Sequence, residues 1–447
     1  MKLCIKTTAL QVATMGSLLA LFAAAGVSAH DNVPARAQIQ PITIVGATVH
    51  TVSGKDIPNG RVRFEDGRIV AVGGSDVSTE GSEVIDASGK QLYPGYIAAD
   101  GTLGLAEVSA VRATVDVAEV GLNNADVRAD TAFNADSEII PVTRANGVLL
   151  ALSVPGSGNG NVIAGRSALM RLDGWTQEDM LVLAPAALHV NWPGGAIPSW
   201  LPPPAQQGAR EAQKKGRVAL RDAFEAAKRY AAAKAAGARH EPDRRLEAMV
   251  DAVEGRQPVF FEADDAQSIQ ESLDFAREFD LKAVIVGGAD AWQLADVLKA
   301  QAVPVILSGL NRLPRTRGDG VDSIFAGPAK LAAAGVEFAI SNGGGSFDTS
   351  NLRNLPYQAA AAVPFGLTPA QALRAITLAP ARILGVDDRY GSIGNGLSAT
   401  MFLADGDALE PATQVTRAWI DGREIDLSSR HTRLYEKYRQ KYPETRD

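Results

Sequence analysis

The stretch of sequence that decides the fold is residues 269–307, IQESLDFAREFDLKAVIVGGADAWQLADVLKAQAVPVIL. Apolar residues recur at helical spacing in its first part, at Ile269, Leu273, Ala276 and Phe279. Short apolar runs at 283–286 and 304–307 lie on either side of a second helical pattern at 291–298. Helices that alternate with short apolar strands are typical of a parallel sheet covered by helices. The stretch therefore predicts an α/β fold.

The same alternation continues toward the C-terminus. Residues 331–334 and 336–340 repeat the pattern of helix and strand. Thr368-Pro369-Ala370-Gln371 then marks a helix start, with a capping Thr, a Pro at the first helical position and a Gln three residues after the cap. The alternating region, residues 96–384, has the length of a (β/α)8 TIM-like barrel. An open doubly wound sheet is the alternative fold that fits the same pattern.

The two ends of the chain share a different pattern, in which short β-branched runs are separated by turns. Four such runs lie between Ile42 and Ile85, and Asp66-Gly67 is a hairpin signal within them. A similar pattern near the C-terminus carries the matching signal Asp421-Gly422. We therefore expect both ends to build one composite β-sandwich domain, from residues 30–95 and 385–428.

Two charged segments are expected to form helices. The segment from Pro202 to Arg245 has three prolines followed by an Ala-, Lys- and Arg-rich sequence with apolar residues at helical spacing. It predicts a surface helix on the outside of the barrel, although a basic partner-binding helix is an alternative. The tail, residues 429–447, predicts a terminal helix whose packing residues would be Leu434, Tyr435 and Tyr438.

Composition and charge narrow the classes of partner. The chain has 447 residues, of which 46% are hydrophobic, so it can bury a large core. It has 44 basic and 51 acidic residues, a formal net charge of −7. Binding to nucleic acid needs a concentrated basic surface, so this charge argues against a nucleic-acid partner. A small organic molecule or a protein is the expected partner.

The first 29 residues resemble a secretory signal peptide. Lys2 and Lys6 precede an apolar run at 10–25, and small residues at 27–29 precede the expected cleavage site. A retained membrane anchor is the alternative, but the run is interrupted and short for a bilayer span. Cleavage would give an exported protein, periplasmic or secreted, with no membrane segment. It would also remove Cys4, the only cysteine, which excludes disulfides and thiol catalysis.

The search for catalytic motifs finds no self-contained catalytic site. The sequence has no P-loop, no Gly-x-Ser-x-Gly, no His-Glu-x-x-His and no cysteine cluster. The glycine-rich run at 156–160 resembles a phosphate-binding loop, but an ordinary loop at a strand end is the simpler interpretation. No two of the five histidines share the spacing of metal ligands. Histidine-based metal binding is therefore not expected.

Seven segments together resemble the amidohydrolase superfamily, particularly its exported imidazolonepropionase-like members. They are GATV at 46–49, DGRIVAVG at 66–73, VIDASGK at 84–90, YPGYI at 93–97, LTPAQALR at 367–374, PARILG at 380–385 and GSI at 391–393. This resemblance covers nearly all of the chain after the signal peptide. It implies a barrel whose C-terminal rim holds one or two divalent metals that activate water for hydrolysis of C–N bonds.

The positions of the family's metal ligands are all changed in this chain. The residues that stand there are Asp100 and Thr102 after the first barrel strand, Glu262, Gly287, Asn342 in place of the proton-shuttling Asp, and His189 at or near the bridging Lys. Gly offers no ligand, and Asn lacks the charge and basicity to take a proton from metal-bound water. The resemblance therefore predicts that the family's metal mechanism fails and that no metal cofactor is bound.

Three interpretations follow, and they leave open whether the protein is an enzyme. The first is a catalytically silent paralogue that binds a small amide-type ligand or pairs with an active amidohydrolase subunit, with Thr102, Gly287 and Asn342 as ligand-binding positions. The second is an active hydrolase with a rewired site of Asp100, Glu262 and His189, which would use zinc or manganese, or the two carboxylates as an acid/base pair. The third is a structural role with no ligand.

Overall fold

The structure is a computed structural model that describes residues 33–158, 160–238, 241–316 and 318–441. The chain divides into residues 1–33 and residues 34–447, and the second unit contains every element described below. The predicted signal peptide, residues 1–29, lies outside the described residues and stays a prediction. In the described ranges, no helix is long and apolar enough to cross a membrane.

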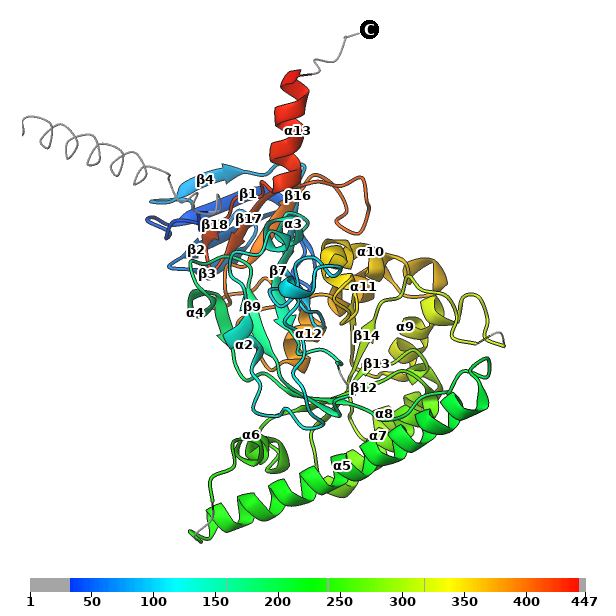
Figure 1. Ribbon diagram of the computed structural model, residues 1–447. Helices are drawn as coiled ribbons and strands as arrows, with labels where there is room; N and C mark the ends of the chain where they lie inside the picture. The colour runs from blue at the N-terminus through cyan, green and yellow to red at the C-terminus, as the bar shows by residue number, and fades with distance from the viewer. Residues whose placement is uncertain (1–32, 159, 239–240, 317, 442–447) are drawn as a thin grey trace, which may run out of the picture. The chain divides into compact units, whose positions relative to one another are not determined.

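The first sheet joins the two ends of the chain, as predicted. Its eight strands are β1 (Ile42–Val49), β2 (Ile57–Glu65), β3 (Arg68–Gly73), β4 (Glu83–Asp86), β5 (Gln91–Pro94), β16 (Met401–Ala404), β17 (Val415–Ile420) and β18 (Arg423–Glu424). Strand β5 is the link, because it pairs in parallel with β1 and antiparallel with β16. In Figure 1 the blue N-terminal strands accordingly lie beside the orange and red C-terminal strands. The prediction of a composite β domain is confirmed.

The two predicted hairpin turns contact each other. Asp66 and Gly67 have φ angles of 48° and 79°, and Asp421 and Gly422 have φ angles of 46° and 74°. Both residues of each turn are thus in the left-handed region that two-residue hairpins require. A side chain on Gly67 would begin 2.8 Å from the Asp421 carbonyl oxygen, so only glycine fits where the turns meet.

The second part of the fold is a TIM-like α/β barrel. Its strands form two hydrogen-bonded sheets, in the orders β15-β14-β13-β12-β11-β8 and β10-β9-β7-β6. Their bounds are β6 (Tyr96–Ala98), β7 (Val148–Ser153), β8 (Ile163–Arg166), β9 (Ala168–Arg171), β10 (Leu181–Leu183), β11 (Leu188–Asn191), β12 (Val259–Ala263), β13 (Ala283–Gly287), β14 (Val305–Ser308) and β15 (Phe338–Ser341). From β11 to β15 all neighbours are parallel. The mixed α/β fold expected from the sequence is confirmed.

One part of the barrel departs from the strict alternation of strand and helix. Strand β8 pairs antiparallel with β11, and β9 pairs antiparallel with β7. A parallel connection needs a crossover of about a dozen residues or more, but only Ser167 separates β8 from β9. No crossover helix fits there, so the chain passes directly from one sheet into the other.

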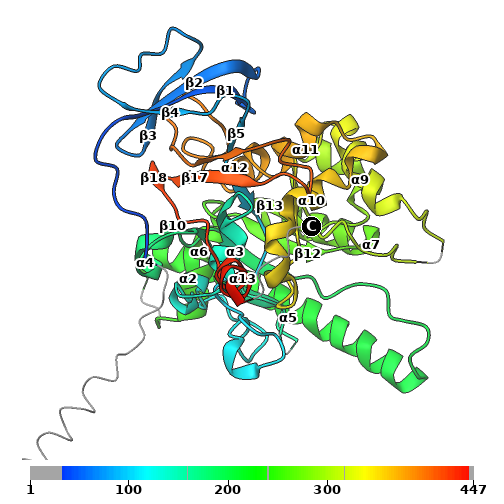
Figure 2. The same ribbon diagram turned by 90° about the horizontal axis from the view of Figure 1, so that it is seen from above.

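Helices cover the barrel and connect its strands (Figures 1 and 2). They are α2 (Ala129–Ala132), α3 (Ile139–Arg144), α4 (Gln177–Met180), α5 (Pro203–Ala235), α6 (Arg244–Val253), α7 (Ala266–Phe279), α8 (Ala295–Ala300), α9 (Ser323–Ala334), α10 (Leu355–Ala360), α11 (Pro369–Ala375), α12 (Leu378–Ile383) and α13 (Arg430–Lys441). Short 3₁₀ helices lie at Arg112–Thr114, Ala291–Leu294, Asp348–Asn354 and Val363–Phe365. The Thr368 capping box predicted for α11 is present.

The two charged segments form helices, but only one of them packs as expected. Leu220 and Phe224 of α5 are fully buried in the barrel core, as predicted for a helix on the outside of the barrel. In α13, Leu434, Tyr435 and Tyr438 are 38%, 59% and 49% exposed, so the prediction that they pack is wrong. The helix is too rich in charged residues to present a continuous apolar stripe.

The composite domain can be tested at a buried aromatic contact between its two parts. Trp419 of β17 is fully buried, and its ring meets Phe64 of β2 edge-on, with centroids 6.0 Å apart. We expect Trp419→Ala to lower the free energy of unfolding by about 3 to 5 kcal/mol in a urea titration, because it leaves a cavity between the two chain ends. Trp175, which is 65% exposed, supplies the control: Trp175→Ala should change this free energy by less than about 0.5 kcal/mol. Equal effects of the two changes would contradict the composite core.

Candidate functional site

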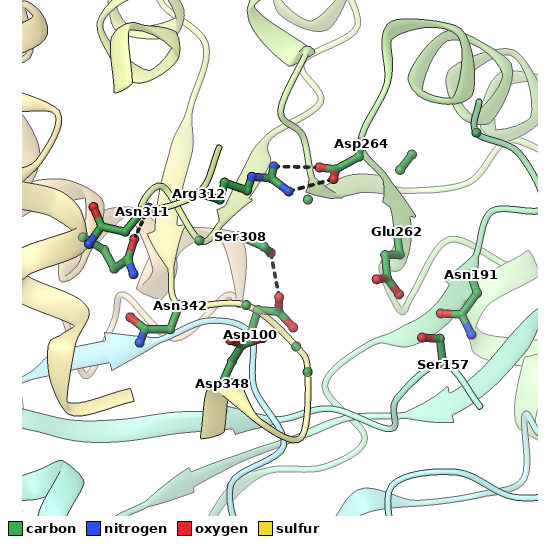
Figure 3. A pocket seen from close by; sticks show the side chains of 18 of the residues that line it. Asp100, Ser157, Asn191, Glu262, Asp264, Ser308, Asn311, Arg312, Asn342 and Asp348 are labelled. Carbon is green, nitrogen blue, oxygen red and sulfur yellow. Dashed lines mark hydrogen bonds and ion pairs between the residues drawn. The ribbon is translucent and has the colours of Figure 1, made fainter. Parts of the chain in front are cut away.

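A cavity of about 1030 Å³ opens at the C-terminal ends of the barrel strands. Six of the residues that line it lie at or just after these strand ends, namely Gly287 and, labelled in Figure 3, Asp100, Asn191, Glu262, Ser308 and Asn342. Parallel strands bring their carboxyl ends to one rim, which is why residues far apart in the sequence meet here. Four of the six predicted site residues, Asp100, Glu262, Gly287 and Asn342, are therefore in one cavity wall.

His189 does not line this cavity. It lies on β11 two residues before Asn191, so the two side chains are on the same side of the strand and His189 lies deeper in the barrel. The ring packs against Phe260, with centroids 5.1 Å apart, and its Nε2 atom has no hydrogen-bond partner among the described residues. Burial lowers the pKa of His189 to about 3. The histidine is therefore a neutral core residue beneath the cavity.

Thr102 also lies outside the cavity wall. Its side chain is fully buried, and its hydroxyl is hydrogen-bonded to the hydroxyl of Thr349 in the 3₁₀ helix at Asp348–Asn354. This contact fastens the loop after β6 to the segment after β15. The structure thus gives Thr102 a structural hydrogen bond at the position where the resemblance places a ligand.

Asp100 is held in place from two neighbouring strands. Its backbone N–H donates to Ser341 Oγ at 3.1 Å, and Ser341 Oγ donates to the Asp100 carbonyl at 2.8 Å. Ser308 Oγ donates to Asp100 Oδ2 at 2.6 Å. Burial raises the pKa of Asp100 to about 6, although the Ser308 hydrogen bond acts in the opposite direction.

Glu262 faces Asp100 across the cavity (Figure 3). Its side chain is exposed to the space of the cavity but is surrounded by protein, and no described residue forms a hydrogen bond or ion pair with it. Burial raises the pKa of Glu262 to about 7, and the charges of Asp100 and Asp264 add to this shift. The cavity thus holds two carboxyl groups that both resist losing their protons.

Three other charged residues of the wall, Asp264, Arg312 and Asp348, were not predicted from the sequence. Arg312 donates from Nη1 and Nη2 to the two carboxylate oxygens of Asp264, at 2.8 and 3.0 Å. Burial acts to raise the pKa of Asp264, but the hydrogen bond and charge of Arg312 lower it overall. Asp348 lies beside Asp100 in Figure 3. Asp264 follows β12 directly, so its position at a strand end could have indicated it, whereas Arg312 and Asp348 lie in loop and 3₁₀ segments that carry no such signal.

Gly287 and Asn342 cannot act as charged ligands where they stand. Gly287 has a φ of 93°, and a Cβ atom there would be 2.9 Å from Asp264 Oδ1. The side chain of Asn342 donates from Nδ2 to the Asn351 carbonyl, and its buried Oδ1 has no partner among the described residues. The positive φ angle thus favours glycine at position 287, and the contact with the Asn351 carbonyl holds the amide of Asn342 in place.

With this geometry established, the comparisons identify the class of protein. The model of the amidohydrolase family matches residues 194–425, more than half of the chain, so the chain belongs to that family. Its structure is similar to an amidohydrolase from Thermotoga maritima MSB8, with a TM-score of 0.77 and 27% identity over 86% of this chain and 99% of that chain.

More distant solved structures share the fold alone. Molinate hydrolase has a TM-score of 0.51 and 17% identity over 88% of this chain and 96% of its own. An adenosine deaminase from Xanthomonas campestris, solved with bound zinc, has a TM-score of 0.51 and 17% identity over 89% of this chain and 97% of its own. No curated protein matches the chain.

The residues present do not fit the metal centre that is usual in this family. The donor set at the ligand positions is one aspartate, one glutamate, one amide, a glycine and a threonine hydroxyl already bonded to Thr349. Within the described ranges, no group of three or more His, Cys, Asp and Glu side chains is placed to hold a metal ion. The described residues therefore do not supply the ligand set of the family's usual metal mechanism.

The raised pKa values predict a particular pH dependence of stability. The pKa values of Asp100 and Glu262, about 6 and about 7, lie above the ordinary values of 3.8 and 4.5. At these two groups the folded state therefore holds more protons than the unfolded state from about pH 4 to about pH 7, so their contribution to the free energy of unfolding falls as pH rises through this window, whereas the lowered pKa of His189 acts in the opposite direction. In urea titrations across it, this fall should be smaller for the double variant Asp100→Asn, Glu262→Gln.

The matched control for this measurement is Glu410→Gln, at an exposed glutamate outside the cavity. Its pH dependence should match that of the unmodified protein. Parallel curves for the double variant and the unmodified protein would show that the two carboxyl groups titrate normally.

Proposed function

We propose that this amidohydrolase-family protein is catalytically silent and that its rim cavity binds a small amide-type ligand. One observation carries the proposal. At three of the positions that would hold the family's metal, the side chain is hydrogen-bonded elsewhere in the protein or, at the glycine, is missing. Thr102 is bonded to Thr349, the Asn342 amide donates to a backbone carbonyl, and Gly287 is a glycine in the left-handed region. Water activation by a metal needs charged or basic ligands at these positions.

The cavity itself suits ligand binding. Its volume is in the range of small-molecule sites, and amide side chains line it at Asn191, Asn311, Asn342, Asn351, Asn354 and Gln358. Gln358 accepts from the backbone N–H groups of Leu310 and Asn311 at 2.8 and 3.0 Å, which fixes its Oε1 and leaves its amide N–H₂ without a protein partner in the described part of the chain. Amide groups both donate and accept, so such a wall complements an amide-type ligand.

A second candidate function is a metal-free hydrolase in which Asp100 and Glu262 act as an acid/base pair. The observation that favours it is their shared cavity and their raised pKa values, about 6 and about 7. Carboxyl groups with different pKa values near neutral pH are the usual partners in acid/base catalysis. His189 has no part in this candidate, because it lies beneath the cavity and not in its wall.

The first candidate predicts that single restorations of the family's residues give no activity. With Asn342→Asp, hydrolysis of dipeptides and cyclic amides should stay at the level of a protein-free control, measured by release of amine. Metal ligands act as a set, and one added carboxylate only adds an unpaired charge. Gly287→His is further obstructed, because its Cβ would meet Asp264 at 2.9 Å.

The alternative has a distinct outcome in the same assay. Hydrolysis by the unmodified protein that is lost in both Glu262→Gln and Asp100→Asn, and retained in Glu410→Gln, would establish the carboxylate-pair hydrolase and overturn the silent assignment.

A further inference from the structure

The cavity wall carries an excess of negative charge. Five carboxylates and one guanidinium line it, namely Asp100, Glu262, Asp264, Asp265 and Asp348, with Arg312. Arg312 is committed to Asp264 through two hydrogen bonds. Asp265 caps α7 by accepting from the backbone and hydroxyl of Ser268. The other three carboxylates have no cationic partner among the described residues.

Two of these carboxylates have oxygens with no partner. Asp100 is only 5% exposed, and although its Oδ2 accepts from Ser308, its Oδ1 has no hydrogen-bond partner in the described structure. Figure 3 shows Asp100 and Glu262 on opposite sides of the same open space. A charged group that is withdrawn from water without a counter-ion, as Asp100 is, lowers stability, and such groups cluster at binding and catalytic sites. Among the described residues of the wall, the only positively charged donor is Arg312, which is bonded to Asp264 and not to Asp100 or Glu262.

We propose that the cavity binds an organic cation, a molecule with a protonated amine or a guanidinium that lies between Asp100 and Glu262. The proposal rests on the proposed ligand-binding function and specifies its ligand: an amide-type molecule that also carries a positive charge. The N–H groups of the cation donate to Asp100 Oδ1 and to the Glu262 carboxylate, while the amide side chains of the wall bind its neutral part.

The shape of the site favours an organic cation over a metal ion. Asp100 follows β6 and Glu262 belongs to β12, two strands that are not hydrogen-bonded neighbours. Both residues line the cavity of about 1030 Å³, which has room for a molecule of many atoms. A metal ion needs its ligands to converge at about 2.0 to 2.6 Å, whereas an organic cation spans a wider gap with separate N–H groups.

Three probes that share a six-carbon chain with a terminal amide test the charge requirement by isothermal titration calorimetry with the full chain. They are 6-aminohexanamide, which is cationic, hexanamide, which is neutral, and adipamate, which is anionic. We expect the cationic probe to bind at least about tenfold more tightly than the neutral one, a difference of about 1.4 kcal/mol, because the neutral probe leaves Asp100 and Glu262 without a counter-charge. The anionic probe should bind more weakly than both.

Substitutions locate the binding to the two carboxylates. Glu262→Gln and Asp100→Asn should each weaken the cationic probe at least about tenfold and leave the neutral probe unchanged. Glu410→Gln makes the same chemical change outside the cavity and should leave all three affinities unchanged. Circular dichroism and urea titration of each variant check that the fold is retained.

The outcomes separate this inference from the proposed function. Equal affinity for the cationic and neutral probes, or no binding of the cationic probe, overturns the organic cation. Stoichiometric binding of manganese or zinc alone that is lost in Glu262→Gln overturns it in favour of a metal site. Hydrolysis of a bound probe contradicts the silent function but leaves the cation preference supported.

Discussion

The hydroxyl of Ser341 is the contact on which the site depends. It accepts from the N–H of Asp100 and donates to the carbonyl of the same residue, so it ties the end of the first barrel strand to the end of the last. Strand β6 has only three residues and leads directly from β5 of the composite sheet. The Ser341 contact therefore joins the terminal sheet, the first barrel strand and the rim cavity, and it fixes where the Asp100 carboxylate stands.

This arrangement separates the fold from the chemistry of its family. The barrel core is built from buried apolar strands, so under the proposed function the ligand positions can differ while the fold stays intact. The changed positions are not left as gaps, because Thr102 and Asn342 have new hydrogen bonds and Gly287 has a backbone conformation that favours glycine. What stays in the wall is a set of carboxylates, of which only Asp264 has a cationic partner among the described residues.

The sequence predicted the fold well because its signals are local. Alternating apolar periods indicated the barrel, and the turns at Asp66-Gly67 and Asp421-Gly422 indicated matching hairpins, although not that the turns would contact each other. Four of the predicted site residues, Asp100, Glu262, Gly287 and Asn342, also lie in one cavity wall, while their roles stay a prediction. Sequence could not show that His189 lies one layer below Asn191, because that depends on how far each strand extends toward the rim. It could not place Arg312 or Asp348, since loops beyond a strand end have no periodicity to read.

Elemental analysis tests the central claim most directly, which is that this amidohydrolase-family barrel has lost its metal centre. The protein, purified without chelators from cells grown with trace zinc and manganese, should contain much less than one equivalent of either metal per chain. One or more equivalents per chain, absent from a Glu262→Ala variant that is still folded, would contradict the account and show a rewired metal site.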